Sequence, residues 1–400
     1  MNTESRILNE LRQAVKNKMG KDISSSSHCE EIAAEIKKMG IVINPQTFRR
    51  FFGLIKSSGK FHIYTLDTLA QYCDFSDFAT FKKNLIDDEL ELFLEGVKTE
   101  SQEFDYWKLS ETLCSKIIES PSLLASVHHQ LLKYPLARTF FMEHHPMRDL
   151  AGTVYLQYFQ EYLKYEETNE ARLFAYGFLY MGSFLTQNNE FRNIYFNKIE
   201  ETPLTTDVYI LPAGRKFGVL LLEAWLRKDE IKFNNIWNEM LFVRQRYIEF
   251  SERSVCSFEY AVLEHIIFTD KTEEMLFLIE NNTFQVHSDR KFITQHRKEN
   301  HDTCWNIMCA MAYIKAKKQA KSKSYLNKVS LDKLALGWKK YYSIMYYFVY
   351  YNFADREEKS KIINELTELI EETHFTYYSG RLRELVKART CADQSLLQTS

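Results

Sequence analysis

The sequence predicts an all-α protein in which a small N-terminal helical module is followed by a long body of paired helices. The 400 residues include only 12 Gly and 6 Pro, which is too few to turn a many-stranded sheet. All six prolines lie at or before Pro212, so the rest of the chain must turn at Gly, Asn, Asp and Ser, as short helix connections do. Apolar residues also recur at helical spacing in block after block.

Composition limits the classes of protein to consider. At 45% hydrophobic residues the chain is too apolar for disorder and too long for one compact core, so we expect at least two units. The net charge of −2 excludes a globally basic coat for nucleic acid. Seven cysteines without a CxxC pair are typical of reduced thiols. With no signal peptide and no long uncharged stretch, we expect a cytoplasmic protein that does not bind a membrane.

The N-terminal module is expected to cover residues 1–95. A one-sided apolar stripe predicts a helix over residues 4–19. The serines at 24–27 form a loop with capping residues, and a second helix is expected from Glu30 to Met39, ended by Gly40. Asn44 and Pro45 then open a third helix, because Asn caps helices and Pro fits the first helical position.

The helix after Asn44 has the residue order that a DNA-reading helix requires. Its polar residues come first and its aromatic residues follow, so that the polar end meets base edges while the aromatic end anchors the helix. Between residues 32 and 66 the only acidic residue is Glu35, against six Lys and Arg, which predicts a local phosphate footprint. We expect Gln46, Arg49 and Arg50 to face the groove, with Lys37, Lys38, Lys56 and Lys60 on phosphates.

Residues 65–83 contain a second possible reader. Thr65 is expected to cap one helix and Ser76 the next, with a turn at Asp74 between them. The segment resembles the helix-turn-helix of AraC-type regulators, because Ala70, Phe75, Ser76 and Phe81 stand at that family's spacing, although Asp74 replaces its Gly. The resemblance implies that the helix after Ser76 faces DNA. The acidic residues 87–91 would repel phosphates there, so the first segment is the better reader.

A different interpretation of both segments stays open. Short helices joined by Gly, Asn or Ser turns pack into bundles in many proteins that bind no nucleic acid. In that case the aromatic residues of both segments are simply core. The N-terminal module would then cap the body and hide its first apolar face, and the protein would be a pure interaction scaffold.

The body is expected to cover residues 96–400, after a polar linker between about Glu95 and Tyr106. The blocks of helical periodicity run over residues 150–163, 171–185, 217–225, 231–250, 255–268, 304–316, 334–348 and 362–370. Helix pairs that recur about every 35–40 residues predict a degenerate α-solenoid of the tetratricopeptide sort. In such a solenoid, stacking buries the apolar face that one pair cannot bury alone.

The segments TFRRFFGLI and YTLDTLAQYCDFSDF, together with the tail ALGWKKYYSIMYYFVYYNFADREE, resemble a bacterial family of helical-repeat, tetratricopeptide-like proteins. Members of that family carry an N-terminal helix-turn-helix-like module, so the resemblance implies an architecture rather than an activity. A solenoid binds peptides or protein segments on its concave face. We therefore expect a protein partner or signal on the body, and self-association is a further expectation.

Catalytic and metal-binding patterns are weak. The adjacent histidines at 128–129 and 144–145 diverge on a helix, and His301, Cys304 and Cys309 lack a fourth ligand, so we expect no metal and no cofactor. GxxxxGK[ST], HExxH, GxSxG and GxGxxG are all absent. The pairs Arg138 with His144, and Arg290 with His296, have the spacing of helical ribonucleases of the HEPN group, a lesser alternative.

The sequence thus favours a non-enzymatic regulatory adaptor. Its N-terminal module would contact DNA, while its helical body binds a partner or a signal. The pure scaffold is the first alternative, and the helical ribonuclease is the second.

Overall fold

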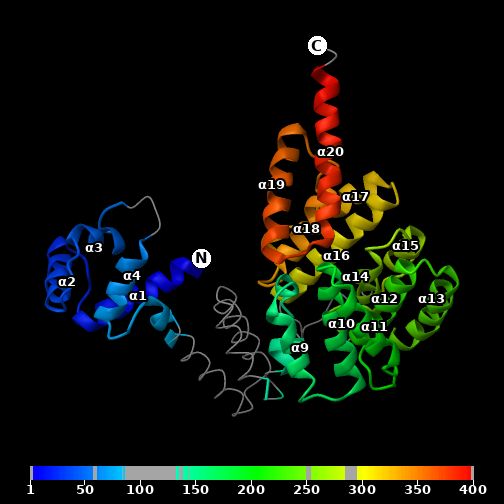
Figure 1. The fold of residues 1–400 in the computed structure, drawn as a ribbon, viewed down its shortest axis with the longest axis horizontal. Helices are drawn as coiled ribbons and strands as arrows, with labels where there is room; N and C mark the ends of the chain where they lie inside the picture. The colour runs from blue at the N-terminus through cyan, green and yellow to red at the C-terminus, as the bar shows by residue number, and fades with distance from the viewer. Residues whose placement is uncertain are drawn as a thin grey trace. The chain divides into compact units, whose positions relative to one another are not determined.

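The computed structural model describes residues 3–56, 61–82, 84–85, 132–133, 135, 138–143, 145–248, 254–283 and 295–397. The chain divides into two compact units, Met1–Val127 and His128–Ser400. The expected boundary near residue 95 lies outside the described residues and stays a prediction. Within the described ranges every regular element is a helix and none is a strand, so the all-α fold class is confirmed (Figure 1).

The described helices of the first unit are α1 (Thr3–Met19), α2 (Ser26–Lys38), α3 (Pro45–Phe51) and α4 (Ile63–Tyr72). The last three begin at capping side chains. The Ser25 hydroxyl accepts the N–H of His28 to cap α2, which therefore starts four residues before the predicted Glu30. Asn44 caps α3 as predicted, since its Oδ1 accepts the N–H of Gln46 at 2.9 Å.

The cap predicted at Thr65 is wrong. His62 caps α4 instead, with its Nδ1 accepting the N–H of Tyr64 at 3.2 Å. Thr65 lies inside the helix and is buried, because α4 begins two residues earlier, at Ile63. The cap predicted at Ser76 is also misplaced, by one residue. Asp77 caps the helix instead, since its Oδ1 accepts the N–H of Thr80 at 2.7 Å.

One apolar core joins α1 to α4 and the residues that follow them. Its buried members are Leu11, Val15, Ile23, Cys29, Ile32, Ile36, Phe48, Phe51, Leu66, Leu69, Ala70, Tyr72, Phe78 and Phe81. The stripe predicted for residues 4–19 faces this core. Two aromatic residues, Phe48 and Phe51, anchor α3, and the Arg12 guanidinium lies 5.0 Å from the Phe51 ring centre. The short helix α3 is thus held along its apolar side.

The turn after α4 takes the conformation that glycine adopts most easily. Asp74 has φ of 70°, the left-handed region, and the N–H of Phe75 donates to the carbonyl of Ala70 at 3.0 Å. Lys18 Nζ lies 2.5 Å from the Asp74 carboxylate, which steadies the turn. An Asp can therefore occupy the position where AraC-type readers carry Gly, while the resemblance itself stays a prediction.

The second unit is a series of helices packed as consecutive pairs (Figure 1). They are α9 (Gln157–Tyr162), α10 (Asn169–Leu185), α11 (Asn189–Glu201), α12 (Ile210–Leu226), α13 (Glu230–Arg244), α14 (Phe258–Ile266), α15 (Thr272–Glu280), α16 (Gln295–Lys315), α17 (Gln319–Leu326), α18 (Lys339–Tyr350), α19 (Arg356–Thr373) and α20 (Tyr377–Leu397). The first helices of successive pairs also pack on each other, α10 on α12, α12 on α14 and α16 on α18. The predicted tetratricopeptide-type solenoid is a finer statement and stays a prediction.

Most predicted blocks coincide with one helix, but residues 150–163 do not. That stretch holds the short helices η2 (Arg148–Leu150) and η3 (Val154–Leu156) before α9. Two local features interrupt the helix there. A Cβ on Gly152 would lie 2.2 Å from the carbonyl oxygen of Thr373, and Thr153 turns the chain by capping η3. Apolar spacing alone could not reveal either contact.

Three helix pairs are joined by the same turn. Gln187, Lys228 and Lys317 each have φ of 58° directly after α10, α12 and α16. In the first two pairs the next residue caps the second helix, with Asn188 accepting the N–H of Phe191 and Asp229 that of Lys232. The breaks TQNNE and RKDE in the sequence are therefore tight turns, and the second helix of each pair starts from the same geometry.

The helices α12 and α14 come together at two glycines one turn apart. A Cβ on Gly214 would lie 2.7 Å from the carbonyl oxygen of Phe258, and a Cβ on Gly218 would lie 2.8 to 2.9 Å from His265. Real Cβ atoms do not approach this closely, so the two helices need glycine at both positions. The contact places α14, which carries the polar network described below, against α12.

We expect the substitution Gly218→Ala to destabilise the protein by about 1–3 kcal/mol, because its methyl group overpacks the buried His265 side chain. Gly380→Ala is the matched control. Nothing lies within 4 Å of a Cβ at Gly380 in α20, so alanine there should add about 0.5–1 kcal/mol. Chemical unfolding of both variants measures the difference, and equal stabilities would contradict the tight α12–α14 contact.

Candidate functional site

Four cations of the first unit are exposed and have no ion-pair or hydrogen-bond partner among the described residues. Lys37 and Lys38 end α2, Arg50 lies on α3, and Lys56 follows α3. We call them the α2–α3 cations. They come from two helices that pack on each other and from the segment after them. Gln46, in the first turn of α3, is also exposed.

Several other cations among the described residues of this unit are paired with acids. Lys16 pairs with Asp22 at 2.9 Å, and Lys18 pairs with Asp74. Lys21 contacts Glu31 in the same way. The acidic side chains are thus used elsewhere on the unit, which leaves a local positive charge on α2 and α3 in a chain of nearly neutral total charge.

Arg49 differs from its neighbours. It is half-buried, and its Nη2 lies 2.7 Å from Glu30 Oε1 on α2. This pair ties α3 to α2 and competes with the predicted role of Arg49 in contacting bases, which stays a prediction. Lys60 lies outside the described residues.

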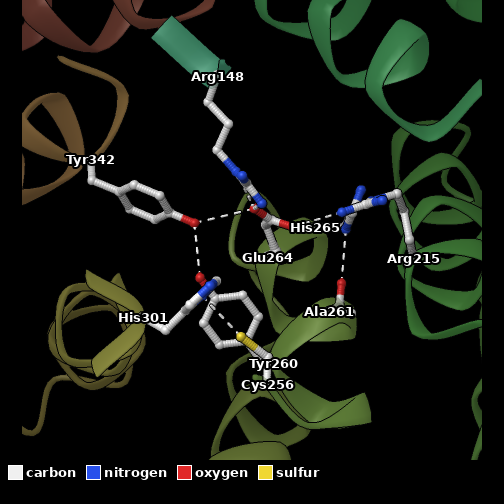
Figure 2. Close-up of polar contacts among 9 residues, drawn as sticks. All are labelled: Arg148, Arg215, Cys256, Tyr260, Ala261, Glu264, His265, His301 and Tyr342. Atoms are coloured by element: carbon white, nitrogen blue, oxygen red, sulfur yellow. Dashed lines mark hydrogen bonds and ion pairs between the residues drawn. The ribbon is translucent and has the colours of Figure 1, made fainter. Parts of the chain in front are cut away.

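The second unit contains a buried polar network that joins η2, α14 and α18 (Figure 2). Arg148 Nε donates to Glu264 Oε1 at 2.8 Å, and Tyr342 OH donates to the same oxygen at 3.2 Å. The hydroxyls of Tyr342 and Tyr260 are 3.1 Å apart. The Arg148 guanidinium also stacks on the Trp338 ring, 3.8 Å from its centre. The network thus connects segments that are far apart in the sequence.

Arginine charges keep Glu264 ionised. Burial alone would raise its pKa, but Arg148 and Arg215 together lower the pKa of Glu264 to about 2. Burial lowers the pKa of Arg215 to about 10, against the opposing charge of Glu264. All three groups are therefore charged at neutral pH.

Asp149 caps α18 from a distant part of the chain. Its carboxylate accepts the backbone N–H of Tyr341 at 2.8 Å and that of Lys340 at 3.1 Å. No residue next to α18 does this, since Trp338 at its start makes no capping bond. Burial raises the pKa of Asp149 to about 6, while the two N–H bonds oppose the rise.

A cysteine and a histidine lie next to this network, in an arrangement known from thiol nucleophiles. Cys256 Sγ and His301 Nδ1 are 3.0 Å apart, and both line a small cavity. A nucleophile requires the thiolate. Here burial raises the pKa of Cys256 well above its usual value and lowers that of His301 well below it, so both groups are neutral. The pair is therefore a buried polar contact rather than an activated thiol.

The Arg–His pairs of the ribonuclease alternative are only partly described. Arg138 is buried, with its Nη2 2.6 Å from Glu166 Oε1, whereas His144 and Arg290 lie outside the described residues. Neither Arg–His pair is thus tested. Among the described residues no three His, Cys, Asp or Glu side chains gather as metal ligands do.

No family model, curated protein or solved structure matches this chain. Of the helices in the described parts of the chain, none combines the length and the apolar character needed to cross a bilayer.

No motif in the sequence marks the members of the buried network. Arg148 and Glu264 are 116 residues apart, so spacing carries no signal for the pair. One signal was present, because Glu264 and Arg215 are charges inside helical runs rich in apolar residues, EYAVLEHIIF and LPAGRKFGVLLL. A charge in such a position usually has a buried partner.

We expect Asp149→Ala to lower the free energy of unfolding by about 1–3 kcal/mol, because two buried N–H groups at the start of α18 lose their acceptor. Asp149→Asn keeps one acceptor oxygen and should cost less. Denaturant unfolding of the three proteins gives the order. If the alanine variant were as stable as the parent, Asp149 would not act as the cap of α18.

The neutral Cys256–His301 pair predicts an unreactive thiol. In the native protein at pH 8, iodoacetamide should label Cys256 far more slowly than in the protein unfolded with guanidinium, because the thiol is buried and protonated. Mass spectrometry of the Cys256 peptide measures both rates. Faster labelling in the native protein would instead identify an activated nucleophile.

Proposed function

We propose that this protein is a non-enzymatic regulatory adaptor whose first unit binds DNA and whose helical body binds a protein partner or a signal. The observation that carries the proposal is the set of α2–α3 cations, which are exposed and have no acidic partner among the described residues. Partnered cations contribute little to phosphate binding, because their charge is already balanced.

Unpaired cations favour DNA binding because they release counterions from the DNA. A cation without a protein partner can replace a counterion condensed on DNA, and each replacement strengthens binding and makes it salt-dependent. The α2–α3 cations lie on helices fixed to the core through Phe48 and Phe51. Rigid placement favours contact, since little conformational freedom is lost on binding. Gln46 is exposed in the first turn of α3, where a base contact would be made.

The partner-binding role of the body is supported by the second helices of two of its pairs. Large apolar residues are exposed on α11, namely Phe191 and Ile194, and on α13, namely Ile231 and Phe242. Aromatic and aliphatic side chains on the surface are typical of contact sites.

DNA binding can be tested with two charge-matched variants. We expect replacing Lys37, Lys38 and Arg50 by Ala to weaken binding of a mixed-sequence duplex by roughly ten- to a hundredfold at low salt. The slope of log affinity against log salt should fall by about 2–3. The control replaces Lys16, Lys18 and Lys21, which removes the same charge but takes it from paired cations. Fluorescence anisotropy with the intact chain gives both quantities.

If both triple variants lose affinity equally, the effect comes from total charge and the α2–α3 cations have no special role. An intact protein with no measurable affinity for duplex DNA at low salt would contradict the proposal. Thermal unfolding of each variant shows that the fold is kept.

A specific observation favours the pure scaffold as the second candidate. Met39 and Val42, between α2 and α3, are 47% and 76% exposed. An apolar surface next to cations suits an acidic protein segment as well as DNA. A pull-down with the intact chain, assayed for both protein and nucleic acid, separates the candidates. If the protein is a pure scaffold, the pull-down should recover protein and no nucleic acid. The Val42→Ser variant should then recover less protein.

A further inference from the structure

A small cavity in the second unit is lined by two arginines and one carboxylate. Arg148 on η2, Arg215 on α12 and Glu264 on α14 border it, together with apolar side chains that include Phe178 and Leu185. All of these residues are buried, and the two arginines are 7% and 6% exposed. Figure 2 shows both guanidinium groups extending toward the Glu264 carboxylate from different directions.

The two guanidinium groups have more donors than the surrounding residues accept. Arg148 donates to Glu264 through Nε, but its Nη1 is buried and has no acceptor in the described part of the chain. Arg215 makes no hydrogen bond to any described residue, and its nearest acid, Glu264, is 3.8 Å away. The Phe178 ring, 4.3 Å from the Arg215 guanidinium carbon, contacts its face but offers no acceptor for N–H groups. Buried donors of this kind normally have acceptors.

Two arginines and only one carboxylate line the cavity. Arg148 and Arg215 carry two positive charges, and Glu264 carries one negative charge. His265 adds none, because burial lowers its pKa to about 4. The nearby carboxylate of Asp149 is directed to the backbone N–H groups of α18, and neither guanidinium bonds to it. One buried positive charge therefore has no hydrogen-bonded counterion, and such a charge is costly in an apolar interior.

The size of the cavity selects its occupant. The space open to the centre of a water-sized atom is about 20 Å³. A single atom of water size or slightly more therefore fits. Water could accept hydrogen bonds but would leave the charge uncompensated. A monatomic anion satisfies both the donors and the charge.

We propose that the cavity between Arg148 and Arg215 is a binding site for a monatomic anion, chloride under ordinary conditions. The site links η2, α12 and α14, so its occupation stabilises the arrangement of these helices. Because the anion binds the folded protein and not the unfolded chain, stability should rise with its concentration. This inference is independent of DNA binding.

The test is thermal unfolding of the intact chain at constant ionic strength, with sodium chloride exchanged for sodium gluconate. Gluconate is too large for the cavity. Above the dissociation constant, each tenfold increase in chloride should raise Tm by roughly 2–5 °C. Bromide should act like chloride, and its anomalous scattering in crystals should place it between the two arginines.

Two variants change the charge in opposite directions. Arg215→Met leaves the balanced pair of Arg148 and Glu264, so Tm should no longer depend on chloride. Glu264→Gln adds one more uncompensated positive charge, so the site should bind chloride more tightly and the rise in Tm should begin at a lower chloride concentration. Equal Tm in chloride and gluconate for the parent protein would show that water occupies the cavity and would overturn the proposal.

The proposal would also be overturned if chloride raised the Tm of Arg215→Met as much as that of the parent protein, because the effect would then arise elsewhere. Should Arg215→Met fail to fold, the bromide position in the parent protein decides the question. Density between the two arginines supports the site, and its absence at saturating bromide refutes it.

Discussion

The ion pair between Arg148 and Glu264 organises the second unit. It brings a short helix, η2, onto α14, and the hydroxyl of Tyr342 adds α18 to the same carboxylate. Such a pair contributes less to net stability than to the choice of one arrangement, because its desolvation offsets most of its attraction. Apolar surfaces of α10, α12 and α14 could pack in several registers. Only one register lets Glu264 meet its partners, so the buried charges select it.

Local signals in the sequence were enough to predict the fold class and most helix positions. Scarce Gly and Pro excluded a sheet, and the Asn44–Pro45 pair marked the start of α3. The misplaced caps had a different cause. His62 rather than Thr65 begins α4, because the start of a buried helix depends on the core it joins and not only on its capping residue.

The candidate sites were predictable to different degrees. Charge counting found Lys37, Lys38 and Arg50, because a surface patch follows from local composition. It could not show that Arg49 pairs with Glu30, which depends on how α2 and α3 pack. The polar network around Glu264 was missed for the same reason, since its members come from segments that only tertiary contacts bring together.

The cap that Asp149 gives to α18 has a consequence for biosynthesis. The two partners are 191 residues apart, so a ribosome that adds 5–20 residues per second needs roughly 10–40 s between making the one and the other. Throughout that time the nascent chain carries Asp149 without the backbone N–H groups that it accepts in the folded protein. The early helix pairs therefore complete their packing only after the late ones are synthesised. A chaperone that shields exposed apolar surface would stay bound longest in this interval.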